Sequence, residues 1–294
     1  MERIEQAYAK VNLYLDVTGK RPDGFHDLKS VMHTVTLADT VTVNAKLADY
    51  SCITVEMVNS NIPADERNLA YLAAEAFLEE TGISAAVNIR VDKKIPDRAG
   101  LGGGSADCAA TLRALNRLFA YPLSKDALLA LGAQLGADVP FCILGGTRLC
   151  EGKGEKMKEY PVEKLYFVIA APEEERIETP KAYAMLDEAF DNYENEDDSL
   201  HDALFSFFDE DGLDGMYNVF ESVVLPNAPI ASSLRSRLIT LGARGAMMTG
   251  SGTAVFGVFD SEEAARYADS EEAARYAASD IEGAFLCESA PVYE

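Results

Sequence analysis

Residues 99–108, AGLGGGSADC, hold four glycines within five positions, with Leu101 as the interruption. The strand-like segment AAVNIRVDKKIP precedes them, and AATLRALNRLF, which has the apolar spacing of a helix, follows. A glycine-rich turn between a strand and a helix lets backbone N–H groups approach an anion, and the helix adds its unpaired first-turn donors. The stretch therefore predicts a phosphate-binding loop, although close packing of the helix on the strand would explain the glycines equally well.

Two common nucleotide-binding motifs do not fit this loop. The P-loop pattern GxxxxGK[ST] occurs nowhere in the sequence. The dinucleotide pattern GxGxxG fails because Ser105 stands where the third glycine would be. If the loop binds phosphate, the positive charge that a P-loop lysine provides must come from another part of the chain.

Composition and charge indicate a cytoplasmic globular protein. The 294 residues are 48% hydrophobic, which is enough for a buried core and suggests about two domains. A net charge of −23 argues against partners such as nucleic acid or a membrane surface. The charged start MERIEQAYAK shows no signal peptide, and no apolar run approaches the ~20 residues of a membrane helix. Five cysteines without CxxC spacing suit a reducing compartment.

The order of strand-like and helix-like segments indicates an α+β protein of two domains. YAKVNLYLDV alternates as a strand, and two helices are expected to end at Gly82 and Gly136. The segment GADVPFCILGGTRL is expected to leave the second of these helices and become a strand. New strand material begins after Pro161, so we predict domains at residues 1–161 and 162–294.

One segment of nine residues, DSEEAARYA, occurs at 260–268 and again at 269–277. Nine residues turn a helix through two and a half revolutions, so the two copies cannot present the same face to one sheet. We therefore expect one copy to pack and the other to protrude or bulge. We interpret the pair as a tandem duplication without a catalytic role.

Outside the glycine loop, two charged residues are candidates for chemistry. Lys10 and Asn12 share one face of the first predicted strand, whose opposite face is apolar. A lysine there is costly unless it meets an anion or a carboxylate, although an edge-strand lysine in solvent is the alternative. Asp138 follows a predicted helix end, where an ordinary turn aspartate is the alternative reading.

Four segments in order carry a resemblance to a known family: AKVNLYL, IPDRAGLGGGSADCAATLRALN, GADVPFCILGGTRLCEGKGE and MTGSGTAVFGVF. They resemble the motifs of the GHMP kinases, over nearly the whole chain. The resemblance implies two domains, of which the N-terminal one is ribosomal protein S5 domain 2-like and binds ATP. The C-terminal domain would be ferredoxin-like.

The segment GKRPDGFHDLKSVMHTV is similar to one branch of that family. This branch phosphorylates a small-molecule substrate, a methylerythritol linked to cytidine diphosphate, for isoprenoid precursor synthesis. Alternatives are a GHMP kinase acting on homoserine or mevalonate, and a catalytically silent nucleotide-binding regulator with the same fold. Fold alone does not decide among them, because one fold hosts many functions.

The resemblance also implies roles for residues that match the family's motifs. Asp138 would take the proton of the substrate hydroxyl, and Lys10 would stabilise charge on the transferred group. Asn68 and Lys94 resemble residues near the adenine of ATP. Mg²⁺ would be held by phosphate oxygens and water, with Ser105 as a candidate ligand. The loop that would wrap the triphosphate comprises Pro96, Asp97, Arg98, Ala99, Gly100, Leu101, Gly102, Gly103, Gly104, Ser105 and Ala106.

Substrate contacts follow from the same resemblance. Phe25 and His26 match the family's cytidine pocket, Tyr183 matches its second aromatic residue, and Thr179 lies near Tyr183 in the sequence. Asn12 would help to hold the methylerythritol end beside Lys10. Plain core packing is the alternative for the aromatic residues. Within the glycine loop, Asp97 and Arg98 depart from the family pattern, which usually has small or apolar residues there.

Overall fold

The structure is a computed structural model that describes residues 1–190, 198–259 and 283–293. The duplicated nine-residue segment lies outside these residues. The N-terminal elements are β1 (Glu2–Lys20), β2 (His26–Leu47), β3 (Cys52–Val58), α1 (Leu69–Thr81), β4 (Ala85–Asp92), α2 (Gly103–Leu118), α3 (Lys125–Leu135), α4 (Val139–Leu144), β5 (Thr147–Gly152) and β6 (Lys156–Glu159). The C-terminal elements are β7 (Tyr166–Ala170), α5 (Thr179–Ala189), α6 (Asp198–Asp211), β8 (Tyr217–Asn218), α7 (Glu221–Val224), α8 (Pro229–Thr240), β9 (Gly245–Met248), β10 (Val255–Phe259) and β11 (Phe285–Glu288), with short 3₁₀ turns at Gly212–Gly215 and Leu225–Asn227.

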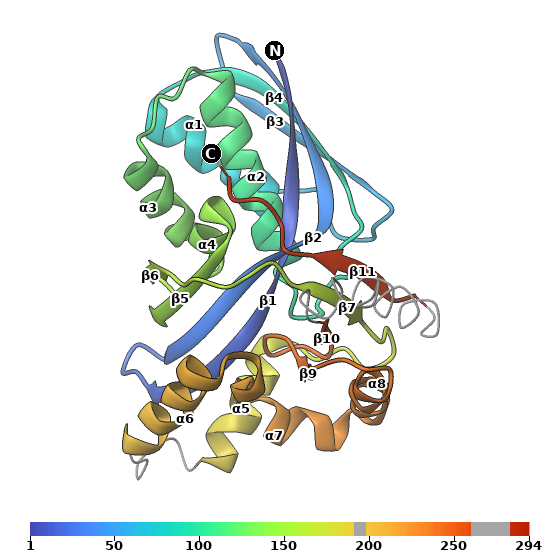
Figure 1. The fold of residues 1–294 in the computed structure, drawn as a ribbon. Helices are drawn as coiled ribbons and strands as arrows, with labels where there is room; N and C mark the ends of the chain where they lie inside the picture. The colour runs from blue at the N-terminus through green and yellow to red at the C-terminus, as the bar shows by residue number, and fades with distance from the viewer. Residues whose placement is uncertain (191–197, 260–282, 294) are drawn as a thin grey trace.

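The larger sheet has the strand order β3-β4-β2-β1-β8, and β5 pairs with both β2 and β6. Its antiparallel strands β1 and β2 run along most of the molecule (Figure 1). Helices α1 and α2 cover one face of the upper part of this sheet (Figure 1). β4 alternates between buried and less buried residues, as expected for a strand with one face against helices.

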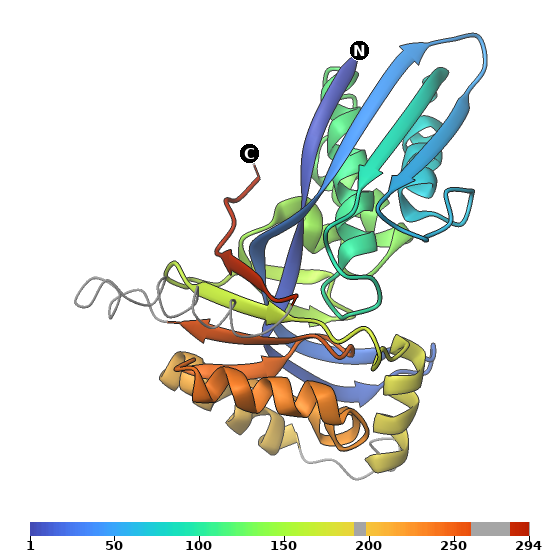
Figure 2. The same ribbon diagram turned by 90° about the vertical axis from the view of Figure 1, so that its right-hand side faces the viewer.

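The smaller sheet has the order β11-β7-β10-β9, and α8 lies along one of its faces (Figure 2). β8 joins the larger sheet by pairing in parallel with β1 at Tyr14 and Leu15. Leu15 and Val17 of β1 pack in the same core as Val168 of β7. The boundary near residue 161 stays a prediction, because β1 contributes to both cores.

Local sequence signals account for several helix ends. α1 ends at Gly82, whose φ of 64° is the left-handed conformation that favours glycine. Ser124 caps α3 by accepting a hydrogen bond from the N–H of Ala127. α2 begins earlier than the sequence suggested: Gly102 is its N-cap, so Ser105 lies in the first turn of the helix.

The strand expected directly after Asp138 is wrong in its first part. Residues Val139–Leu144 form α4, and the strand β5 starts only at Thr147. Pro140 lies in the first turn, where a missing N–H costs nothing and the fixed φ favours a helix. All six residues of α4 are buried, so their apolar run reflects tertiary burial and not strand pairing.

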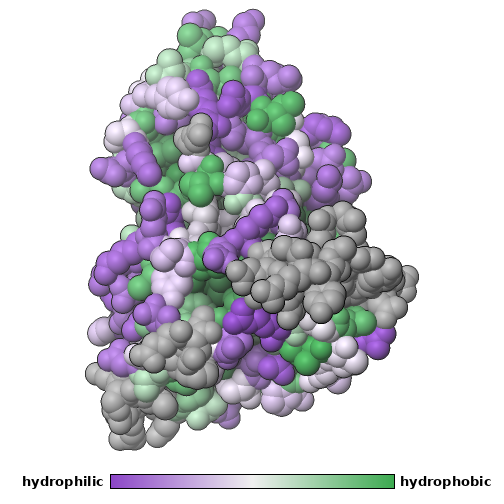
Figure 3. All heavy atoms as spheres, viewed as in Figure 1, coloured by the Kyte–Doolittle hydropathy of each residue, from purple (hydrophilic) through white to green (hydrophobic). Residues whose placement is uncertain are grey.

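Hydrophilic side chains cover much of the face shown in Figure 3, in keeping with the net charge of −23. Among the described residues, no helix combines the length and apolar character needed to cross a membrane.

Candidate active site

A cavity of about 770 Å³ opens between the glycine loop, β1 and α5. The loop residues 96–105 form one wall, while Lys10 from β1 and Asp138 from the start of α4 also line it. Thr179 and Tyr183 reach the same cavity from α5. The fold thus brings together residues that are more than one hundred positions apart in the sequence.

Lys10 and Asp138 face each other inside this cavity. Their Nζ and Oδ2 atoms are 3.6 Å apart, and the Lys10 side chain is 6% exposed against 30% for Asp138. The pairing of β1 with β2 is irregular between Tyr8 and Lys10 and again between Asn12 and Tyr14. Irregularities of this kind re-aim side chains, which is why they are common beside functional sites. A buried ammonium beside a reachable carboxylate can serve both charge stabilisation and proton transfer.

Asn12 fixes the Lys10 ammonium and a second glycine turn at once. Its Oδ1 accepts from Lys10 Nζ at 2.8 Å and from the N–H of Gly250 at 3.0 Å. Its Nδ2 donates to Ser30 Oγ at 2.8 Å. Asn12 lines the cavity but is only 1% exposed, and these bonds engage both ends of its amide. Contact with a substrate stays a prediction for this residue.

The second glycine turn, residues 250–252, was not among the site residues expected from the sequence. Gly100 has φ 81°, and a methyl group there would collide with the carbonyl oxygen of Thr249. A methyl group on Gly250 would lie 3.3 Å from Lys10 Nζ and 2.9 Å from the carbonyl oxygen of Gly100. The glycines therefore allow two turns and the lysine to meet. The G-S-G pattern in MTGSGTAVF was the available sequence signal.

The N-terminus of α2 lies at the cavity. Gly102 caps the helix without any side-chain hydrogen bond. The first N–H groups of an α-helix have no partner within the helix, and the helix dipole adds partial positive charge there. Gly103, Gly104 and Ser105 form this turn and line the cavity. The arrangement can bind phosphate without a P-loop lysine.

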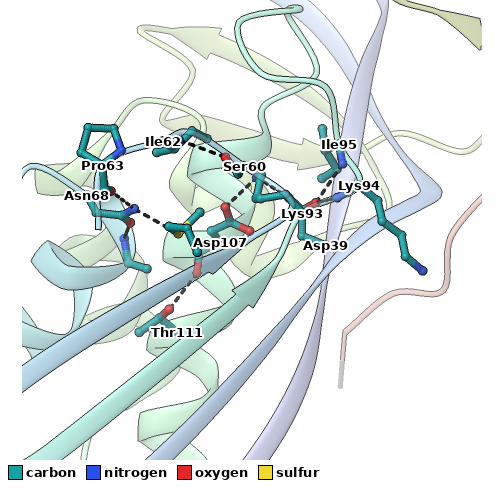
Figure 4. Close-up of polar contacts among 12 residues, drawn as sticks. Asp39, Ser60, Ile62, Pro63, Asn68, Lys93, Lys94, Ile95, Asp107 and Thr111 are labelled. Carbon is teal, nitrogen blue, oxygen red and sulfur yellow. Dashed lines mark hydrogen bonds and ion pairs between the residues drawn. The ribbon is translucent and has the colours of Figure 1, made fainter. Parts of the chain in front are cut away.

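A buried ionic cluster supports the entry to the loop (Figure 4). Lys93 Nζ donates to a carboxylate oxygen of Asp39 and, at 2.7 Å, to Asp107 Oδ2. Asp39 Oδ1 also accepts from the N–H groups of Lys94 and Ile95, at 2.6 and 2.8 Å. Burial raises the pKa of Asp107, an effect that the nearby Lys93 partly opposes. Lys93 lines the cavity, whereas the Lys94 side chain is exposed and points away from the cluster.

Three residues expected at the nucleotide do not line the cavity of the described chain: Asn68, Lys94 and Ala106. Asn68 is the N-cap of α1, where its Oδ1 accepts from the N–H of Ala70 at 2.9 Å. Its Nδ2 donates to the carbonyl oxygen of Pro63 at 2.7 Å (Figure 4). Ala106 is buried inside α2. Asn68 and Ala106 thus have structural contacts within the fold, and Lys93 lines the cavity where Lys94 does not; the nucleotide contacts expected of Asn68, Lys94 and Ala106 stay predictions.

An aromatic corner closes the other end of the cavity. The rings of His26 and Tyr183 have centroids 4.7 Å apart, and Tyr183 packs edge-on against Phe220 at 4.9 Å. Burial raises the pKa of the Tyr183 hydroxyl, so this group stays protonated. Phe25 is 57% exposed at the rim. Its exposure and position on the cavity argue against plain core packing.

Asp187 of α5 holds this corner in place, and the sequence alone did not identify it. His26 Nε2 lies 2.6 Å from Asp187 Oδ1, and Lys20 Nζ lies 2.7 Å from Asp187 Oδ2. Burial by itself would raise the pKa of Asp187, but hydrogen bonds from Lys20 and His26 outweigh burial and lower it. An anionic Asp187 orients the His26 ring toward Tyr183.

The rim of the cavity links α5 to both glycine turns. Ser251 Oγ donates to Thr179 Oγ1 at 3.0 Å. Arg98 has φ 51°, and its Nη1 donates to Glu178 Oε1 at 3.2 Å. Both partners of this second contact are largely exposed, so it contributes little to stability.

Family models match both halves of the chain. The model of the GHMP kinases N terminal domain matches residues 68–146, and that of the GHMP kinases C terminal matches residues 197–271. Solved homoserine and mevalonate kinases share the fold: homoserine kinase from Cytophaga hutchinsonii has a TM-score of 0.69 at 19% identity, covering 99% of this chain and 95% of that one. These matches confirm the predicted α+β architecture.

Curated relatives narrow the assignment. A 4-diphosphocytidyl-2-C-methyl-D-erythritol kinase from Caldicellulosiruptor saccharolyticus is 41% identical over 257 residues, covering 87% of this chain and 88% of the relative. The same enzyme from Bacillus subtilis is 39% identical over 263 residues, covering 89% and 90%. A crystal structure of 4-(cytidine 5'-diphospho)-2C-methyl-D-erythritol kinase matches with a TM-score of 0.74 at 32% identity, covering 99% and 100%. The chain therefore belongs to the GHMP kinases and, within them, to the 4-diphosphocytidyl-2-C-methyl-D-erythritol kinases.

Proposed function

We propose that this kinase transfers the γ-phosphoryl group of ATP to the 2-hydroxyl of 4-(cytidine 5'-diphospho)-2-C-methyl-D-erythritol. The carrying observation is the Lys10–Asp138 pair, 3.6 Å apart in a cavity whose wall is the glycine loop. The reaction is a step of isoprenoid precursor synthesis. We place it in the cytoplasm, in line with the charge of −23 and the unpaired cysteines.

In this proposal Asp138 accepts the proton of the substrate hydroxyl as its oxygen bonds to the γ-phosphorus. The bond from that phosphorus to the bridging oxygen of ATP breaks, and ADP leaves with the electron pair. Lys10, held by Asn12, lies where its ammonium stabilises the negative charge on the transferred group. Phosphoryl transfer needs little covalent help from a protein, so positioned charges of this kind carry most of the catalysis.

The residues present fit ATP and Mg²⁺. The N-terminus of α2, whose N-cap Gly102 has no side chain to bond the first N–H groups, offers backbone donors for phosphate oxygens, and Lys93 lines the same cavity. Mg²⁺ keeps several waters and binds through the substrate phosphates in many kinases, so it needs no cluster of protein ligands here. The Ser105 hydroxyl is the protein group at hand for that ion, which neutralises phosphate charge when bound.

For the cytidine end we propose the aromatic corner of Phe25, His26 and Tyr183. The exposed ring of Phe25 and the tilted pair of His26 and Tyr183 offer flat surfaces that suit the face of a base, and Asp187 keeps His26 oriented. Thr179 lies between this corner and the second glycine turn. The corner favours a cytidine substrate over homoserine or mevalonate, neither of which has a ring to stack.

A transfer assay tests the proposal. The protein is incubated with ATP and Mg²⁺ and with the cytidine substrate, homoserine or mevalonate, and ADP and the phosphorylated product are measured. Of the three acceptors, we expect only the cytidine substrate to be phosphorylated. Cytidine nucleotides should also raise the melting temperature of the protein. Turnover of homoserine or mevalonate instead would contradict the substrate, and binding of ATP without any transfer would favour a silent regulator.

A further inference from the structure

Arg113, in the middle of α2, is buried where three elements that carry active-site residues pack together. α2 begins at the glycine loop, β1 carries Lys10, and α4 begins directly after Asp138. The Arg113 side chain is 5% exposed, which is rare for an arginine unless its charge and donors are engaged.

Two hydrogen bonds from the guanidinium of Arg113 reach two other elements. Nη1 donates to the carbonyl oxygen of Cys142 in α4 at 2.6 Å, and Nη2 donates to the carbonyl oxygen of Gln6 in β1 at 3.0 Å. The planar fork of arginine can hold two acceptors in one rigid geometry, which a lysine cannot. The last carbonyl groups of a helix have no partner within it, and Arg113 supplies one for Cys142.

The bond to α4 acts close to Asp138. The N–H of Cys142 donates to the carbonyl oxygen of Asp138 at 3.0 Å, so one helical turn connects the arginine contact to the aspartate. The Asp138 carboxylate caps nothing in α4 and points to Lys10. Any sliding of α4 along β1 would therefore change the distance between the Asp138 carboxylate and the Lys10 ammonium.

The guanidinium is itself held from two sides. Its Cζ lies 3.5 Å from the ring centroid of Tyr293, whose hydroxyl donates to the carbonyl oxygen of Gln6 at 2.9 Å. Glu5 Oε2 lies 3.7 Å from Arg113 Nε, which has no hydrogen-bond partner in the described part of the chain. These contacts leave Arg113 one orientation, with its fork toward α4 and β1.

We propose that Arg113 is a positioning residue for phosphoryl transfer: it holds α4, and Asp138 with it, in register with the strand that carries Lys10. The inference rests on the proposed function, since it concerns the base of that reaction. Arg113 contacts no residue of the cavity directly, so it acts through the placement of α4.

The chain offers a matched control, Arg117, one turn further along α2. Its Nη1 donates to Glu5 Oε1 at 2.7 Å, so Arg117→Met and Arg113→Met each remove a cation from the same carboxylate. We expect Arg113→Met to lower kcat about 100-fold, the size of effect that a small misplacement of a reacting group causes. The KM for ATP should stay within about twofold, because the glycine loop is untouched. Arg117→Met, which also removes a cation from Glu5 but no contact with α4, should lose less stability and keep kcat within about twofold.

Two further readouts separate positioning from general damage. In an Asp138→Asn background, Arg113→Met should lower the residual transfer rate by less than about threefold, because the group that it positions is gone. Amide hydrogen exchange of residues 138–145 should be faster in Arg113→Met than in the wild type and unchanged in Arg117→Met. Arg113→Lys keeps the positive charge near Glu5, so the amide exchange rate of residues 138–145 should increase less in this variant. Arg113→Lys replaces Arg113→Met in the test if Arg113→Met does not fold.

The exchange measurement needs no substrate, so it decides the inference even if the transfer assay disproves the proposed function. Unchanged exchange of residues 138–145 in both Arg113 variants would overturn the positioning role. Fully additive losses of kcat in the double variant would overturn it as well, since Arg113 would then act independently of Asp138.

Discussion

Gly100→Ala is expected to separate the two glycine turns that line the cavity, where we propose that ATP binds. Gly100 has φ 81°, and the added methyl group would run into the carbonyl oxygen of Thr249. The left-handed conformation costs a non-glycine residue about 1–2 kcal/mol. Forcing extra atoms into a packed site costs about 1–3 kcal/mol more. We therefore expect the free energy of unfolding to fall by about 3 kcal/mol, a large part of the roughly 5–15 kcal/mol that stabilises most proteins.

Gly82→Ala is the matched control for this variant. Gly82 has φ 64°, and a methyl group there would meet no heavy atom within 4 Å, so the control carries the backbone strain without the collision. Its loss of stability should be about 1 kcal/mol. Urea unfolding gives both values, and the KM for ATP should rise only in Gly100→Ala, because the displaced turn borders Lys10. Equal losses of stability together with an unchanged KM would refute the packing of the two turns.

Three other perturbations have defined outcomes. Lys93→Met leaves two buried carboxylates without their cation, so the free energy of unfolding measured in urea should fall by about 3–5 kcal/mol. Replacing the exposed Lys94 by Met should change it by less than about 0.5 kcal/mol. Equal effects of the two substitutions would contradict the buried ion pairs of Lys93. Asp187→Asn weakens the bond that orients His26, so the KM for the cytidine substrate should rise about tenfold with little change for ATP, and equal rises would argue against a cytidine corner. Burial lowers the pKa of His33 from 6.5 to about 4. Between pH 6.5 and pH 4 the His33 side chain therefore binds a proton in the unfolded chain but not in the folded one. The free energy of unfolding is unaffected by this group above pH 6.5 and should be about 3 kcal/mol lower by pH 4. His33→Gln should flatten that part of a stability profile measured by urea unfolding, and an unaltered profile would count against it.

The sequence allowed elements to be predicted where the signal is local. The period of two in β1, the C-cap glycine of α1 and the N-cap serine of α3 each depend on a few neighbouring residues. The glycine loop between β4 and α2 is a signal of the same kind. The meeting of Lys10 with Asp138 was implied by the family resemblance, because no local pattern relates the two positions.

The predictions were wrong or incomplete where contacts between residues far apart in the sequence determine the structure. The buried run of α4 looks like a strand until its neighbours α2 and α3 cover it on several sides. Lys93 and Lys94 are adjacent, and only the folded chain shows that Lys93 lines the cavity while the Lys94 side chain is exposed. Asp187 belongs to the aromatic corner only through its contact with His26, which lies 161 positions away in the sequence. Local patterns in one sequence give no signal for contacts between residues at such separations.

We propose above that Asp138 acts as the base beside Lys10, at the end of a nucleotide held by backbone donors. The most direct measurement is a rapid-quench comparison of wild type and Asp138→Asn with ATP, Mg²⁺ and the cytidine substrate, accompanied by titration of ATP binding. We expect the transfer rate of Asp138→Asn to fall about 10²–10⁴-fold while the dissociation constant of ATP changes by less than about threefold. A transfer rate in Asp138→Asn equal to that of the wild type would contradict it.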